Sequence, residues 1–142
     1  MREQRETAVR LWFDMWLKKA DLGILHLFAP DAVYIESWGP EYRGAEAIRH
    51  WFEEWNTRGT VLQWDILEFF HKGDQTVVRW TFRNRMNDGR REGEEFEGMS
   101  LVRWTRDGRI AFLQEFGCNE NRYDPYRDGP EPQFREGSAL WF

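Results

Sequence analysis

The chain has 142 residues, which suits one domain whose core buries roughly two-thirds of the surface of the unfolded chain. Its 25 Asp and Glu residues outnumber its 20 Lys and Arg residues, and the net charge of −5, with both signs interspersed, excludes a nucleic acid as partner. Cys118 is the only cysteine, which excludes an intrachain disulfide.

The first helix is predicted over residues 4–19, where apolar side chains recur at helical spacing and form a broad stripe. The stripe contains Ala8, Val9, Leu11, Trp12, Phe13, Met15, Trp16 and Leu17. This N-terminal segment carries mixed charge and lacks the apolar run of a secretory signal. No stretch approaches the roughly 18 apolar residues of a membrane span. We therefore expect a cytoplasmic protein with no membrane partner.

A shorter helix is predicted over residues 22–28, with Asp21 as its cap and Pro30 as its stop. A strand is predicted over residues 32–38, and Gly39-Pro40 ends it. Its two faces hold Val33, Ile35 and Ser37 and, opposite them, Tyr34, Glu36 and Trp38. A carboxylate between two aromatic side chains is either solvated at an edge or enclosed in a lined cavity.

A third helix is predicted over residues 45–56, where apolar residues follow the i, i+3, i+4, i+7 pattern. The residues that follow Gly59 change to long segments rich in β-branched and aromatic residues, separated by turn sequences. They predict four strands in a meander, over 60–71, 75–86, 94–105 and 109–119, with turns at Lys72-Gly73-Asp74, Asn87-Asp88-Gly89 and Arg106-Asp107-Gly108. Residues 120–142 are rich in Pro and Gly and predict an irregular tail with an apolar end, Ala139–Phe142.

This order predicts an α+β fold in which three N-terminal helices pack in the concave face of a curved, mostly antiparallel sheet. We expect one domain over 1–142, with a core at 4–119. A sheet wrapped around helices encloses a cone, and a cone lined by Trp and Phe offers a ligand site at its mouth.

The segment "LFAPDAVYIESWGPEYRGAEAIRHWF" (27–52) and the order of the elements resemble the nuclear transport factor 2-like superfamily, in its SnoaL-like and ketosteroid isomerase-like branch. The shared pattern falls on Leu27-Phe28-Ala29, Asp31-Ala32, Gly44 and Ala47-Ile48. The resemblance implies a cystatin-like cone, a small hydrophobic ligand and a homodimer formed through the sheet. The phrases "HWFEEWN" and "EFGCNENRYDPY" also resemble a group of bacterial proteins with no assigned reaction.

The resemblance aligns Glu36 with the carboxylate base of the isomerases, Trp12 with their oxyanion-binding Tyr, and Ser100 with their protonated Asp. An aromatic pocket desolvates a carboxylate, which raises its pKa and suits it to move protons near neutral pH. The alternative for Glu36 is a buried carboxylate satisfied by Arg, Tyr or Trp donors.

Glu115 shares a strand face with Ala111, Leu113 and Gly117, and the resemblance places it at a pocket-facing position. Two carboxyl groups in one cavity would differ in proton affinity and provide an acid and a base. The alternative for Glu115 is a salt bridge to an Arg of the next strand. The side chains predicted to contact a ligand are Trp12, Trp16, Tyr34, Trp38, Trp55, Trp80 and Ser100.

Other chemistries lack their residues in this chain. His26, His50 and His71 each lack a second His or Cys at ligand spacing, so we predict no metal and no cofactor. The Arg-x-Asp relay of the epoxide hydrolases in this superfamily is missing from the long strands, as is the His pair of scytalone dehydratases.

Three hypotheses follow. The first is an enzyme of isomerase, cyclase or lyase type that transfers a proton on a small apolar carbonyl compound, with Glu36 as base and Glu115 as acid. The second is a non-catalytic domain that binds a flat hydrophobic molecule. The third is an association module that uses the Ala139–Phe142 tail and the outward strand face of Arg79, Arg83 and Arg85.

Overall fold

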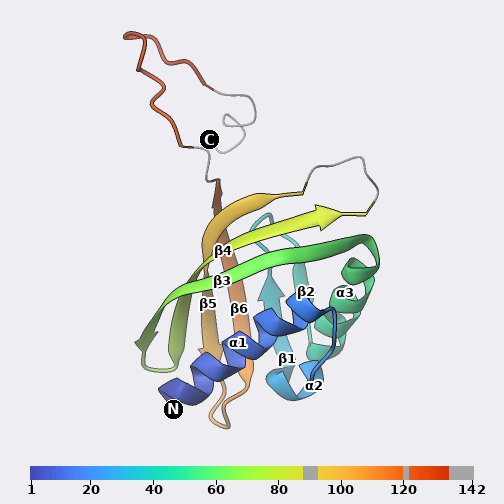
Figure 1. Ribbon diagram of the computed structural model, residues 1–142. Helices are drawn as coiled ribbons and strands as arrows, with labels where there is room; N and C mark the ends of the chain where they lie inside the picture. The colour runs from blue at the N-terminus through green and yellow to red at the C-terminus, as the bar shows by residue number, and fades with distance from the viewer. Residues whose placement is uncertain (88–92, 120–121, 135–142) are drawn as a thin grey trace.

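The computed structural model describes residues 1–87, 93–119 and 122–134, and its elements follow the predicted order (Figure 1). The elements are α1 (Arg2–Lys18), α2 (Ile24–Leu27), β1 (Phe28–Ile35), β2 (Glu41–Arg43), α3 (Ala45–Arg58), β3 (Gly59–Lys72), β4 (Gln75–Met86), β5 (Glu95–Trp104) and β6 (Ile110–Asn119). The predicted turn at Asp88-Gly89 and the Ala139–Phe142 tail lie outside the described residues. Residues 122–134 contain turns and no helix or strand.

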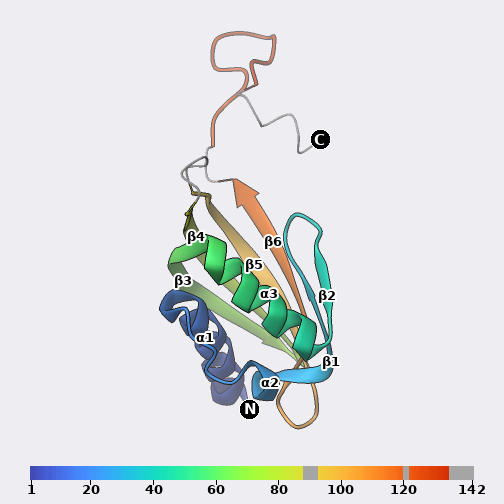
Figure 2. The same ribbon diagram turned by 90° about the vertical axis from the view of Figure 1, so that its right-hand side faces the viewer.

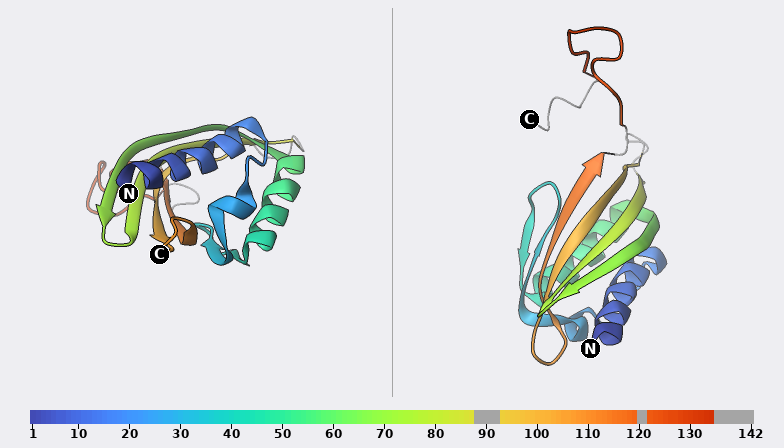
Figure 3. Two further views of the ribbon diagram at one scale, coloured as in Figure 1. Left: turned by 90° about the horizontal axis from the view of Figure 1, so that it is seen from below. Right: turned by 90° about the vertical axis from the view of Figure 1, so that its left-hand side faces the viewer.

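The strands form one sheet in the order β2-β1-β6-β5-β4-β3. Strands β1 and β6 are parallel, and every other neighbouring pair is antiparallel. The sheet is strongly curved, and α1 and α3 both lie on its concave face (Figures 2 and 3). The predicted α+β fold, with helices inside a curved and mostly antiparallel sheet, is confirmed.

Aromatic rings join the helices to the sheet. Phe13 of α1 stacks on Trp64 of β3 with ring centroids 3.8 Å apart, and Trp12 of α1 packs edge-on against Phe28 of β1. On β4, Val78 and Trp80 are buried against the helices, while Arg79, Arg83 and Arg85 on the outward face are exposed. The strand therefore alternates as its sequence pattern predicts. In the described ranges, no helix combines the length and apolar character needed to cross a membrane.

The β1 region differs from its prediction. Strand β1 begins at Phe28 instead of residue 32 and includes Pro30. Pro30 is tolerated because the pairing of β1 with β6 is interrupted between Phe28 and Val33, so no ladder hydrogen bond is required of it. The strand ends at Ile35, and the chain turns back into the short strand β2, which pairs Tyr42 with Tyr34.

The second helix is shorter than predicted and consists of one turn, Ile24–Leu27. Asp21 stands just before it and accepts hydrogen bonds from the backbone N–H groups of Gly23 and Ile24, both at 2.8 Å. Asp21 therefore directs the chain into this turn, although Gly23 occupies the N-cap position.

Candidate functional site

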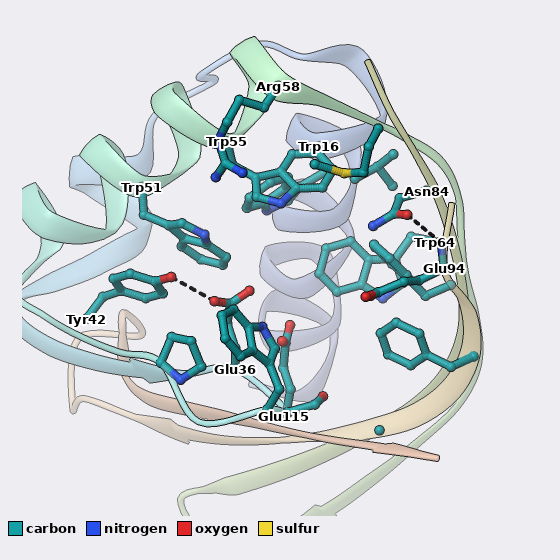
Figure 4. A pocket seen from close by; sticks show the side chains of 18 of the residues that line it. Trp16, Glu36, Tyr42, Trp51, Trp55, Arg58, Trp64, Asn84, Glu94 and Glu115 are labelled. Carbon is teal, nitrogen blue, oxygen red and sulfur yellow. Dashed lines mark hydrogen bonds between the residues drawn. The ribbon is translucent and has the colours of Figure 1, made fainter. Parts of the chain in front are cut away.

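A cavity of about 1140 Å³ opens between α3, the turn after β1 and the concave face of the sheet (Figure 4). This volume is large enough to enclose a drug-sized molecule. Nine of the lining residues are aromatic: Trp16, Trp38, Tyr42, Trp51, Trp55, Trp64, Trp80, Phe82 and Phe96. Five glutamates also line the cavity: Glu36 and Glu115 at one end, and Glu54, Glu94 and Glu95 elsewhere along the wall (Figure 4).

Glu36 lies in the turn that follows β1. Its backbone is fixed there, because its N–H donates to the carbonyl of Pro40 (2.9 Å) and its carbonyl accepts from Gly39 (3.0 Å). The Tyr42 hydroxyl donates to its carboxylate at 2.7 Å. Burial raises the pKa of Glu36, while hydrogen bonds from Tyr42 and Trp38 oppose the rise. The carboxylate thus has Tyr and Trp donors, as expected if Glu36 were a buried carboxylate with a purely structural role. It also faces the cavity.

Tyr42 is itself held in place by α3. Its ring stacks on Trp51 with centroids 4.5 Å apart and planes 12° apart. Burial and the hydrogen bond to Glu36 raise the pKa of Tyr42 well above its usual range, so the hydroxyl remains a proton donor at neutral pH. A residue of β2 and a residue of α3 therefore orient the Glu36 carboxylate together.

Glu115 ends a hydrogen-bond chain that crosses the core. The Trp12 indole N–H donates to the Tyr34 hydroxyl at 3.2 Å, and this hydroxyl donates to the Glu115 carboxyl group at 2.5 Å. Burial raises the pKa of Glu115 to about 8, and the negative charge of Glu36 adds to the rise. The described residues include no Arg in a salt bridge with Glu115, and its side-chain partner is Tyr34.

The two carboxyl groups differ in what sets their proton affinity. Burial raises the pKa of Glu115 to about 8, so this group holds its proton at pH 7. Burial also raises the pKa of Glu36, but its two hydrogen bonds favour the ionised form and oppose that rise. Of the two, Glu115 is thus the better placed to donate a proton and Glu36 the better placed to accept one.

Four of the predicted ligand contacts, Trp16, Trp38, Trp55 and Trp80, line the cavity. The other three lie behind its wall. Trp12 and Tyr34 are fully buried in the chain that leads to Glu115, and Ser100 is fully buried and accepts the indole N–H of Trp80 at 2.9 Å. These three side chains support the groups that line the cavity.

Several lining residues were not singled out from the sequence. Trp51 and Trp64 were interpreted only as helix and strand positions, and Asn84 carried no signal because an isolated amide in a strand matches no motif. The inward face of β4, shared by Trp80 and Asn84, was the available clue. Among the residues that the structure describes, no three His, Cys, Asp or Glu side chains gather as a metal site would require.

Comparisons with known proteins bear on this geometry. The profile of the SnoaL-like domain family matches residues 9–113. Among curated proteins, no sequence matches the chain.

Solved structures share the fold at low identity. A hypothetical protein with a ketosteroid isomerase-like fold from Catenulispora acidiphila, in complex with trimethylamine, is 21% identical with a TM-score of 0.64, over 77% of this chain and 83% of that one. A steroid delta-isomerase from Pseudomonas aeruginosa is 19% identical with a TM-score of 0.60, over 82% and 81%. An LEH-like epoxide hydrolase from Mycobacterium tuberculosis is 13% identical with a TM-score of 0.67, over 82% and 84%.

At these identities the structural neighbours establish the fold alone, because one fold hosts many chemistries. The family match covers more than half of the chain, from α1 to β6. The chain is a member of the SnoaL-like domain family.

Proposed function

We propose that the protein transfers a proton on a small, largely apolar carbonyl compound, as isomerases, cyclases and lyases do. The observation that carries this proposal is the pair of carboxyl groups in one aromatic cavity, each bound to its own Tyr hydroxyl. The aromatic walls suit an apolar substrate body, and the low local polarity strengthens hydrogen bonds to a reacting oxygen.

In this proposal Glu36 is the base and Glu115 the acid. The Glu36 carboxylate removes a proton from the carbon next to the carbonyl. Glu115 donates a hydrogen bond to the carbonyl oxygen, which stabilises the enolate that forms. The proton on Glu36 exchanges with water, and Glu36 then returns a proton to the original carbon or to another carbon of the substrate, so that one proton leaves the substrate and one is added. The proton on Tyr34 supports Glu115 and does not move.

The test is hydrogen–deuterium exchange next to the carbonyl of 1-tetralone, measured by NMR in D₂O. We expect the wild-type protein to accelerate exchange and Glu36→Gln to slow it by about 100-fold or more, the usual contribution of a general base. Glu41→Gln changes an exposed carboxylate on β2 and is the matched control. Equal exchange with Glu36→Gln and wild type would exclude Glu36 as the base.

A second candidate function is binding without catalysis. It is supported by the stacked pair of Tyr42 and Trp51 at the cavity wall, which offers flat surface to a planar hydrophobic molecule whether or not a proton moves. Thermal-shift screening, with mass spectrometry of co-purified molecules, identifies ligands. This function is supported if a ligand binds wild type and Glu36→Gln equally well and the protein neither exchanges its hydrogens nor converts it.

We also propose that two copies associate through the outer face of the sheet. Met99 and Phe116 are paired in register on β5 and β6, and both are largely exposed on this face. Arg79 of β4 is the next residue in the same row. Apolar side chains in a row of charged neighbours are typical of surfaces that pair.

A further inference from the structure

Asn84 is a buried amide in the cavity wall, and it has no part in the proton transfer proposed for Glu36 and Glu115. It lies on the inward face of β4, is 7% exposed, and lines the cavity. A buried amide carries two kinds of polar atom, an oxygen that accepts and a nitrogen that donates. Each of them can form a hydrogen bond, either within the protein or to what fills the cavity.

The oxygen of Asn84 has its partner in the protein. The backbone N–H of Glu94 donates to Asn84 Oδ1 at 2.7 Å, and the backbone N–H of Asn84 donates to the Glu94 carbonyl at 3.0 Å. A backbone N–H can only donate, so the atom that it meets must be the oxygen. This contact fixes which end of the amide faces the strand.

Gly93 makes this contact feasible. A Cβ atom at residue 93 would lie 1.5 Å from the Asn84 carbonyl oxygen, so only a residue without a side chain lets the two backbones approach this closely. The glycine thus brings the Glu94 N–H to the amide oxygen. Local sequence and geometry together set the orientation of one buried side chain.

The nitrogen of Asn84 faces the other way, toward the cavity (Figure 4). No hydrogen bond joins Asn84 Nδ2 to another of the residues that the structure describes. Arg58, the guanidinium on the same cavity wall, is engaged by Glu54 through two contacts of 2.7 and 2.9 Å. Asn84 is therefore a fixed, neutral donor that is directed at whatever occupies the cavity.

We propose that Asn84 forms a second polar subsite, which binds a carbonyl oxygen of the ligand remote from Glu36 and Glu115. The ligand class is an elongated apolar molecule with an oxygen acceptor at each end. The inference rests on the proposed function only in taking this cavity as the ligand site, and it holds for a substrate or for a ligand that is merely bound.

The register of the sheet separates the two subsites. Glu115 pairs with Ser100, and Ser100 pairs with Val78, while Asn84 stands six residues beyond Val78 on β4. Six residues of straight strand span about 20 Å, and the curvature of the sheet shortens the direct path. A single small ketone cannot reach both subsites, whereas a molecule with two linked rings can approach this span.

The test compares two probes of equal shape by isothermal titration calorimetry. The first is 4,4′-diacetylbiphenyl, and the second is 4-acetyl-4′-isopropenylbiphenyl, in which a methylene group replaces one carbonyl oxygen and the carbon stays planar. The same pair on naphthalene, substituted at positions 2 and 6, covers a shorter span. We expect wild type to bind the diacetyl member about tenfold more tightly in at least one pair, the effect of one hydrogen bond to a buried donor.

Asn84→Asp tests the donor itself. The substitution keeps an oxygen for the Glu94 N–H and replaces the cavity-facing donor with an acceptor. We expect the diacetyl preference to disappear, and 4-acetyl-4′-(1-hydroxyethyl)biphenyl, which carries a donor, to become the preferred probe. Asn84→Leu should lose all discrimination. Asn87→Asp makes the same chemical change at an exposed amide and should behave as wild type.

The outcomes separate this inference from the proposed function. Equal wild-type affinity for both members of each pair, or a preference that survives in Asn84→Asp and Asn84→Leu, would overturn the Asn84 subsite alone. Exchange at 1-tetralone would then still stand as evidence for proton transfer. Failure of wild type to bind any of the probes overturns the subsite as well. The wild-type comparison requires no variant, so a variant that fails to fold does not remove the test.

Discussion

Glu115 and its partner Tyr34 occupy a place where a charge is poorly tolerated. The Tyr34 hydroxyl is the hydrogen-bond partner of the carboxyl group, and burial raises the pKa of Glu115 to about 8 from a usual value of 4.5. The folded protein therefore holds this proton more tightly than the unfolded chain does. Ionisation of Glu115 must weaken the fold.

This proton gives the first prediction at the residue scale. Between pH 4.5 and 8 the folded state binds more protons at Glu115 than the unfolded state, so the contribution of this residue to the free energy of unfolding falls as pH rises. We expect a loss of about 1 to 3 kcal/mol from pH 5 to 8.5, less than the full shift implies because the cavity admits water.

Urea unfolding of wild type and Glu115→Gln at a series of pH values measures this loss. Glu115→Gln cannot ionise, so the difference in stability between the two proteins isolates Glu115 from all other titrating groups. The free energy of unfolding of the variant, relative to that of wild type, should rise steadily up to pH 8 and stay constant at higher pH. A difference that stays constant with pH contradicts the assignment.

The residue scale also shows how far sequence could lead to the site. Glu36 and Glu115 were predicted to share a cavity from a family resemblance and strand alternation, and both line it. The same alternation placed Trp38 on the strand face that carries Tyr34 and Glu36. In the structure β1 ends at Ile35, and Trp38 lies on the turn with 79% of its surface exposed. The orientation of Asn84 depends on a contact with the backbone of Glu94, just before β5, which sequence spacing does not reveal.

At the scale of elements, a polar network attaches α1 to the end of the sheet. Glu6 of α1 meets His71 Nε2 at 2.8 Å, and His71 Nδ1 meets the Thr76 hydroxyl at 2.9 Å. The Trp104 indole N–H also donates to the Thr76 hydroxyl at 2.9 Å. Thr76 is fully buried, so this hydroxyl joins α1, β3, β4 and β5 where water cannot replace it.

Thr76→Val removes the hydroxyl and keeps the shape of the side chain. We expect a loss of about 1 to 3 kcal/mol in the free energy of unfolding, because the Trp104 N–H and a His71 nitrogen lose a buried partner. Thr81→Val, on the half-buried outward side of β4, should change stability by less than about 0.5 kcal/mol. Chemical denaturation of both variants measures these changes in stability. Equal losses of stability in the two variants would contradict a role for the network.

The long elements were predictable because their periodicity is repeated many times. Strands β3 and β4 match their predicted spans within one residue, since long alternating segments joined by a Gly-containing turn define a hairpin. The sequence did not predict the two register shifts in their pairing, between Val61 and Gln63 and between Ile66 and Glu68. Strand β2 was missed because three residues, Glu41–Arg43, carry no period. Its existence depends on pairing with β1, a tertiary contact that local sequence does not encode.

At the scale of the whole molecule, the exposed row of Arg79, Met99 and Phe116 gives a prediction about assembly. We expect light scattering at tens of micromolar protein to report twice the 17.3 kDa chain mass. Phe116→Asp places a charge at the β6 end of the row, next to Met99, and should shift the mass toward the monomer. Leu22→Asp alters an exposed apolar residue far from the sheet face and should remain dimeric. A wild-type monomer would exclude the proposed association.

The crowding of Trp16 against five neighbouring rings has an evolutionary consequence. Its indole touches Trp12, Trp51, Phe52, Trp55 and Trp64, and it also forms part of the cavity wall. Replacing such a ring to admit a new ligand also removes packing contacts from the core. A change of ligand specificity at this position therefore lowers the stability of the fold as well. Lineages that change their chemistry should therefore do so at small positions such as Ala47, leaving the indoles in place.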